Sequence, residues 1–175
     1  DKSYIGRIVY KADNGVTGVK IGLETANSST TIGLINSEST DFITKEFKLK
    51  PKSNFGDLAK LNVSFRGTGK VTLAAISLMP EDNIEGFRPD VIALLKELDS
   101  PIYRWPGGNF VSGYDWKDGI GNPDARPTRY ERAWNGLEYN DVGIHEFMQL
   151  CKILDAEANI AVNTGLGDAA LAGNE

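Results

Sequence analysis

The chain has 175 residues, of which 41% are hydrophobic and 25% are charged, as in ordinary globular proteins. Its net charge of −5 argues against a nucleic-acid partner bound through a broad basic surface. No apolar run reaches the length of about 18 residues that predicts a membrane span. A single histidine and a single cysteine exclude a multi-histidine zinc site, an internal disulfide and a cysteine metal cluster. Any chemistry would therefore rest on carboxylates, amides, arginines and aromatic side chains.

Residues 1–78 have the pattern of a β domain. Apolar and polar residues alternate over short segments that are separated by turns rich in glycine, asparagine and serine. The expected strands cover residues 4–10, 19–23, 41–49, 61–65 and 71–78. Short strands at this spacing predict a β-sandwich of the jelly-roll type.

Five aromatic residues of this region have two interpretations, stacking on sugar rings or filling the core. They are Tyr4, Tyr10, Phe42, Phe47 and Phe55. Most of them fall within alternating strand patterns, so we expect them to be core residues. The region contains no tryptophan, which also weakens the case for an aromatic binding platform.

The pattern changes near residue 79 to helices and apolar strands in alternation. Residues 87–98 predict a helix with Pro89 in its first turn, where the missing N–H has no cost. Its apolar stripe consists of Val91, Leu94, Leu95 and Leu98. A strand over residues 102–105, a helix over 143–154 and a short buried strand over 159–163 follow. The second helix has apolar residues on or near one face, at Ile144, Phe147, Met148, Cys151 and Leu154.

This order predicts two parallel strands joined by a helix, whose ends meet at one edge of a sheet. Arg104 and Asn109 would then emerge at the same edge as Asn163. In a (β/α)₈ barrel that edge holds the active site. Only two of the eight strands fall within residues 79–175, so we expect an incomplete, N-terminal part of such a barrel.

Residues 102–134 form a strand and a loop that is too long and too aromatic to be a simple connector. Arg104 lies within an apolar strand, so we expect it to be buried beside an acidic or polar partner. Two roles stay open for it: contact with a catalytic carboxylate or a sugar hydroxyl, and a salt bridge inside a barrel. Asn109 follows two glycines. It can recognise vicinal hydroxyls, because an amide donates and accepts, or it can stabilise the turn.

Of the three tryptophans, we expect Trp105 to be a core residue and Trp134 to line a site. A glycosidase needs two carboxyl groups roughly 5–10 Å apart. The loop contains several acidic residues, and the sequence does not single out any two of them as such a pair. We assign Glu146 to the second helix and expect Asp141 to cap that helix. We expect His145 to be an ordinary residue of this helix, and Cys151 to pack against its neighbours.

Several strings in this half resemble the family 51 glycoside hydrolases, the α-L-arabinofuranosidases. They are RWPGGNFVSGYDW, DGIG, RPTR, AWN, DVGIHEFMQLCK and AVNTGLGD. The resemblance covers roughly residues 76–175. The first 75 residues more weakly resemble the carbohydrate-binding-like β-sandwich that some members insert before the first barrel helix.

The resemblance implies a retaining hydrolase that releases terminal α-L-arabinofuranosyl residues from arabinan- or arabinoxylan-type polysaccharides without a metal or organic cofactor. It places Arg104, Asn109, Phe110 and Trp134 at substrate-binding positions. It also implies that this chain has no catalytic residue, because both catalytic glutamates of the family fall outside it. Asn174 and Glu175 imitate the Asn-Glu pair of the acid/base motif, but they fit the helix that the family places after the VNTGLGD strand.

Two other functions stay open: an endoglucanase or xylanase of the same family, and a non-catalytic carbohydrate-binding module. The expected partner is an arabinose-containing oligo- or polysaccharide, with no nucleic acid and no membrane, and the family implies homo-oligomers of the full-length enzyme. Asp1 is not a natural initiator, so we expect a piece of a longer protein that is inactive alone. The compartment stays open, with a secreted or periplasmic one slightly favoured.

Overall fold

The computed structural model describes residues 2–25, 29–34, 39–51 and 59–175. The chain forms two compact units, Asp1–Pro89 and Asp90–Glu175. In the part of the chain that is described, no helix has the length and apolar character needed to cross a membrane.

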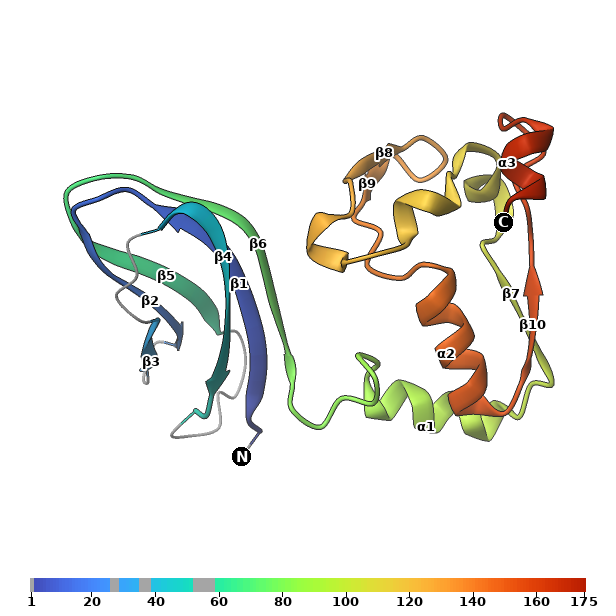
Figure 1. Ribbon diagram of the computed structural model, residues 1–175. Coiled ribbons are helices and arrows are strands. Elements are labelled where there is room, and N and C mark those ends of the chain that lie inside the picture. Colours follow the sequence, from blue (N-terminus) through green and yellow to red (C-terminus); the bar gives the residue numbers. More distant parts are fainter. Residues whose placement is uncertain (1, 26–28, 35–38, 52–58) are drawn as a thin grey trace. The chain divides into compact units, whose positions relative to one another are not determined.

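The first unit consists of two antiparallel three-stranded sheets (Figure 1). Its strands are β1 (Tyr4–Ala12), β2 (Val16–Glu24), β3 (Ser29–Leu34), β4 (Ser39–Leu49), β5 (Lys60–Gly67) and β6 (Val71–Pro80). One sheet has the order β4-β1-β6 and the other β3-β2-β5. All five expected strands are confirmed, and each is longer than expected. The sequence reading missed β3, because its Ser-Thr-Thr start lacks an apolar alternation.

A single apolar core is shared by the two sheets, as in a β-sandwich. Ile8 of β1, Ile21 of β2 and Leu49 of β4 are fully buried in it. Successive strand residues point to opposite faces, so every second residue of β1 from Ile8 to Ala12 enters this core.

Of the five aromatic residues that were expected in the core, three are core residues. Tyr10 and Phe47 are buried in the core, and Tyr4 packs against it. Phe42 is the exception, because its side chain is 50% exposed. Phe55 lies outside the described residues.

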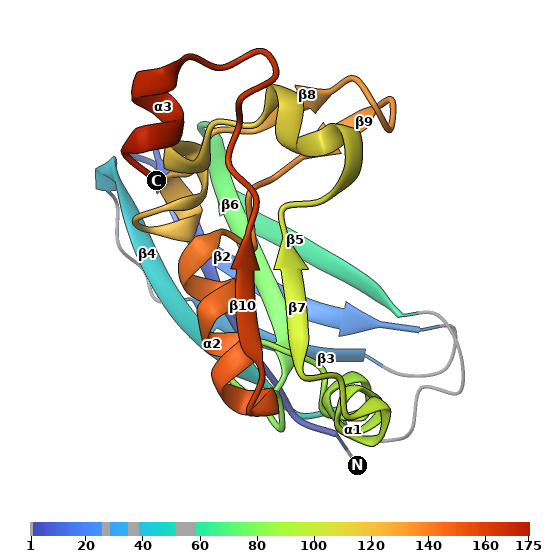
Figure 2. The same ribbon diagram turned by 90° about the vertical axis from the view of Figure 1, so that its right-hand side faces the viewer.

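The second unit contains the expected parallel strand pair. The helix α1 (Pro89–Leu98) leads into β7 (Ile102–Trp105), and α2 (Ile144–Leu154) leads into β10 (Glu157–Ile160). β7 and β10 are paired in parallel from Ile102–Glu157 to Trp105–Ile160, and Figure 2 shows them side by side, pointing the same way. The predicted order of helix, strand, helix and strand is confirmed.

The long segment between β7 and α2 has local structure that the sequence reading did not predict. It contains three 3₁₀ turns, η1 (Gly108–Gly113), η2 (Trp116–Gly119) and η3 (Pro123–Ala125). A small antiparallel hairpin of β8 (Arg129–Glu131) and β9 (Gly136–Glu138) follows. Strands of three residues are too short to produce a recognisable alternation. The chain ends with α3 (Ala169–Gly173).

The stripe expected on α1 is not the buried face of that helix. Ile92 is 2% exposed, whereas Val91, Leu94 and Leu98 are 40%, 64% and 66% exposed. The neighbouring sheet has only two strands among the described residues, so it offers little apolar surface for the helix to cover.

The expectation for α2 is partly correct. Phe147 and Cys151 are buried, but Met148 is 48% exposed. The residue that caps the helix is Gly143 and not Asp141, and the Glu146 carboxylate accepts the N–H of Gly143 at 2.8 Å. The first-turn carboxylate thus satisfies the N–H of the capping residue, whereas a capping aspartate would have accepted an N–H of the first helical turn.

Candidate functional site

The two faces of β7 have different surroundings. Trp105 packs against α2, with its ring stacked on Phe147 at 5.9 Å between centroids and edge-on to Tyr114 at 5.4 Å. The expectation that Trp105 is a packing residue is therefore confirmed. Because side chains alternate along a strand, Ile102 and Arg104 point to the opposite face, where both are exposed.

The expectation of a buried, partnered Arg104 is wrong for this chain. Its side chain is exposed, and none of the ion pairs or hydrogen bonds found among the described residues involves it. The guanidinium lies beside Gly107, where an added Cβ would come within 3.6 Å of Nη2. Arg104 therefore presents its donors on a face of the sheet that the described residues leave open.

Two of the expected site residues, Asn109 and Phe110, line a cavity of about 740 Å³. Both are part of η1, which begins at Gly108, whose φ of +61° favours glycine. The opposite wall comes from the β8–β9 hairpin. None of the hydrogen bonds found in the described part of the chain uses the Asn109 side chain, so its amide is available to a ligand.

Tyr114 forms a buried wall of this cavity. Its ring packs on Phe110 at 4.7 Å between centroids and on Trp105. Burial raises the pKa of the Tyr114 phenol, and the negative charges of Glu138 and Asp118 raise it further. The hydroxyl is therefore protonated at neutral pH and acts as a neutral group.

Asn163, which follows β10, connects the end of that strand to the loop after β7. It is 5% exposed, and its Nδ2 donates to the carbonyl of Tyr114 at 2.9 Å. Its Oδ1 accepts the backbone N–H groups of Gly165 at 3.2 Å and Gly167 at 3.1 Å. The sequence correctly placed Asn163 at the same edge as the residues after β7, and its amide oxygen and one of its amide N–H groups hold the fold there.

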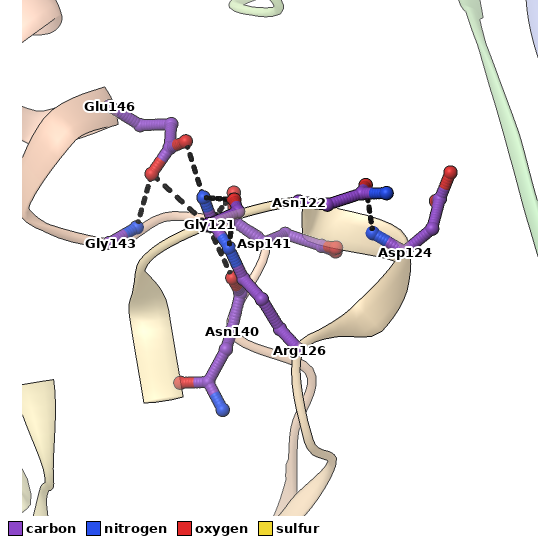
Figure 3. A network of polar contacts seen from close by, with 8 residues as sticks. All are labelled: Gly121, Asn122, Asp124, Arg126, Asn140, Asp141, Gly143 and Glu146. Atoms are coloured by element: carbon purple, nitrogen blue, oxygen red, sulfur yellow. Dashed lines mark hydrogen bonds and ion pairs between the residues drawn. The ribbon is translucent and has the colours of Figure 1, made fainter. Parts of the chain in front are cut away.

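Arg126 is the centre of the polar network that fixes this loop to α2 (Figure 3). Its side chain is 2% exposed. Nη2 and Nη1 donate to the two oxygens of Glu146 at 2.8 and 3.1 Å. The same guanidinium donates to the carbonyls of Gly121 at 3.0 Å and Asn140 at 2.8 Å. The sequence assigned Glu146 to the second helix but gave no sign of its pairing with Arg126.

This network predicts an acid sensitivity of the second unit. Burial alone would raise the pKa of Glu146, but the hydrogen bonds from Arg126 and Gly143 outweigh it and lower that pKa below its ordinary value. A lowered folded-state pKa gives stability that is present above the unfolded pKa, about 4.3, and is lost as the pH falls through the folded value. We expect the free energy of unfolding to fall below about pH 4.3 and to fall less in Glu146→Gln, measured by urea unfolding at several pH values. Equal slopes for the two proteins would contradict the pairing.

Trp134 lies in the turn of the β8–β9 hairpin and is 72% exposed. It is not among the residues that line the cavity, whereas its neighbours Glu131, Arg132 and Ala133 are. The structure thus brings Asn109 and Phe110 together, and leaves Arg104 and Trp134 on other exposed surfaces of the unit. Arg129 and Asp118 form an ion pair in this cavity wall. The sequence contained both charged residues but did not indicate that they would pair.

His145 and Cys151 both belong to α2. His145 is exposed on α2, and burial raises the pKa of the Cys151 thiol, as expected for a packing residue. No group of three or more histidine, cysteine or acidic side chains suited to a metal ion occurs within residues 2–25, 29–34, 39–51 and 59–175.

Glu175 follows α3 and does not line the cavity that contains Asn109. Burial raises the pKa of its carboxyl group, and the charge of Asp115 adds to this. A raised pKa alone is also found at structural positions, so it does not make Glu175 a catalytic acid.

Residues 94–175 match the α-L-arabinofuranosidase 1 domain. This segment belongs to the α-L-arabinofuranosidase family. An intracellular exo-α-(1→5)-L-arabinofuranosidase 1 of Bacillus subtilis is 51% identical over 86 residues, which are 49% of this chain and 17% of that protein. A probable α-L-arabinofuranosidase C of Aspergillus clavatus is 48% identical over 95 residues, 53% of this chain and 19% of that protein. The chain thus spans about a fifth of the length of these relatives.

Solved α-L-arabinofuranosidases have the same fold. The family 51 enzyme of Thermotoga petrophila is 45% identical, covers 54% of this chain and 20% of its own, and superposes with a TM-score of 0.51. An arabinose-bound structure of the MgGH51 α-L-arabinofuranosidase covers 95% of this chain and 30% of its own, with a TM-score of 0.82. Its identity of 21% makes it a likeness of fold alone, and that likeness includes the β-sandwich unit.

Proposed function

We propose that this chain is part of a retaining α-L-arabinofuranosidase that releases terminal α-L-arabinofuranosyl residues from arabinan- or arabinoxylan-type polysaccharides. The observation that carries the proposal is the match of residues 94–175 to the family, over a segment in which Asn109 and Phe110 share one cavity. The names of the relatives agree with it, since one acts on α-(1→5)-linked arabinofuranose and one solved structure binds arabinose.

We further propose that residues 79–175 are the early part of a (β/α)₈ barrel, and that residues 1–78 are a jelly-roll-like, carbohydrate-binding-like domain. The parallel pair β7–β10 with α2 between the strands is the repeating unit of such a barrel. The open face of β7, with Ile102 51% exposed beside Arg104, would point into the barrel. The exposed residues of α1 support the same view, because further βα units would cover them.

The side chains of this segment would bind the sugar and not break the bond. Asn109 would donate to one hydroxyl of the arabinose and accept from its neighbour, and Arg104 would hold a hydroxyl or an acidic group. Trp134 would offer a flat apolar wall. The two carboxyl groups that protonate the leaving oxygen and form the glycosyl-enzyme would come from residues outside this chain.

The test is hydrolysis of 4-nitrophenyl α-L-arabinofuranoside by the longer protein that contains this chain. We expect the wild type to be active and Asn109→Ala to lower kcat/KM by about 100-fold, because hydrogen bonds to the sugar strengthen in the transition state. Glu175→Gln is the matched control outside the cavity and should retain activity.

Three outcomes would contradict this assignment. An inactive wild type that binds polysaccharide would favour a carbohydrate-binding module. Release of cello- or xylo-oligosaccharides without arabinose would favour an endoglucanase or xylanase. Loss of activity in Glu175→Gln would mean that the acid/base lies within this chain.

A further inference from the structure

The indole of Trp134 is largely open to solvent in the described part of the chain. It is 72% exposed, and none of the ring contacts or cation–ring contacts found among the described residues involves it. Such a side chain is restricted mainly to the rotamers that its backbone conformation allows. The orientation of Trp134 therefore depends on the turn of residues 132–135 between β8 and β9.

Glu131 holds this turn through its carboxylate. One oxygen accepts the backbone N–H of Ala133 at 3.1 Å, and the other accepts the N–H of Trp134 itself at 2.6 Å. Both bonds are charge-assisted, which makes them stronger than bonds between neutral groups. The last residue of β8 thus fixes the backbone from which the indole extends.

The base of the hairpin is held separately. Arg129 donates Nε and Nη2 to the two oxygens of Asp118 at 2.7 and 2.9 Å, which attaches β8 to η2. On the other strand, Glu138 accepts the N–H of Asn140 at 2.7 Å, and Asn140 is 1% exposed. Because these contacts fix the base, removal of the Glu131 carboxylate would loosen the turn and leave the strands in place.

We propose that Glu131 is a positioning residue of the enzyme, which sets the Trp134 indole as a wall against the bound sugar. This inference rests on the proposed function, in which Trp134 contacts the substrate. Glu131 would act through the two backbone N–H groups and not through the sugar. Glu131 also lines the cavity, so it could instead contact the substrate directly. An experiment must distinguish these two roles.

A double-mutant cycle in the longer protein makes this separation. We expect Glu131→Ala to lower kcat/KM on 4-nitrophenyl α-L-arabinofuranoside by about 10-fold, mainly through KM, because a wall binds ground state and transition state alike. In a Trp134→Ala background the same change should cost less than about 2-fold, since the residue that Glu131 positions is gone. Glu131→Gln keeps one acceptor oxygen and should recover part of the loss.

The controls decide between the possible outcomes. Glu97→Ala removes an exposed carboxylate from α1, away from the cavity, and should leave KM unchanged. Equal losses from Glu131→Ala with and without Trp134 would overturn the inference, as would an unchanged KM in Glu131→Ala. Both results require an active wild type, whereas a wild type that releases no arabinofuranose would overturn the proposed function itself.

Discussion

Replacement of Arg126 by methionine is expected to destabilise the second unit by about 3–5 kcal/mol. The guanidinium is almost fully buried and bonds both oxygens of Glu146 as well as the carbonyls of Gly121 and Asn140. Methionine fills part of the space but donates no hydrogen bond. The substitution would leave a partly buried carboxylate and several carbonyls without partners, which costs far more than the ion pair itself contributes.

Urea unfolding of the 175-residue chain, followed by tryptophan fluorescence, measures this loss. Trp105, Trp116 and Trp134 all lie after residue 89, so the signal reports on the second unit alone. The matched control is Arg129→Met, which breaks an ion pair whose arginine is 61% exposed and should therefore change the free energy of unfolding far less than Arg126→Met. Similar losses in the two variants would contradict a structural role for Arg126 beyond that of a surface charge.

Replacement of Gly143 by alanine is expected to cost about 3 kcal/mol for a steric reason. A Cβ at this position would lie 1.9 Å from the carbonyl oxygen of Gly119 and 2.6 Å from its carbonyl carbon. Both contacts are with backbone, so no side chain can rotate away. The φ of Gly143 is −113°, which alanine adopts freely, so the loss would come from the close approach of η2 to the start of α2.

Gly173→Ala is the matched control for this substitution. An added Cβ at Gly173, in α3, would meet nothing within 4 Å. Alanine is a better helix former than glycine, so the control should be neutral or more stable by up to about 1 kcal/mol. The same fluorescence-detected urea titration applies. A Gly143→Ala protein as stable as Gly173→Ala would show that the loop and α2 do not pack as closely as described.

Both substitutions remove contacts that form the frame of the candidate site, meaning the contacts between its loop and α2. Arg126 and Gly143 connect the loop after β7 to α2, and the same loop carries Asn109 and the hairpin of Trp134. If the cavity binds sugar as proposed, loss of this frame should also lower the activity of the longer protein.

The sequence by itself determined the elements whose signal is local. The alternating strands of the first unit, the helices of the second and the parallel pairing of β7 with β10 were predicted from periodicity and from the order of the elements. The resemblance to the family was also visible in the sequence, because strings such as RWPGGNF are long and specific.

Only the tertiary structure decided which residues meet across the loop. Arg126 and Glu146 are 20 positions apart, and the sequence offered many other acidic residues at similar distances. The same holds for Arg129 with Asp118, and for the face of α1 that is buried. Hydrophobicity and charge are properties of single residues, whereas a partner depends on how distant segments pack, and one sequence does not specify that pairing.

The exposure of Arg104 could not be predicted from the sequence for the same reason. Its position in an apolar strand led to the expectation of burial beside a polar partner, and that expectation is wrong for this chain. Whether it is covered depends on which segments lie against it, and the described residues place none there. The sequence thus determined the character of this strand, while the packing of the chain determined its exposure, because burial is set by neighbours in space.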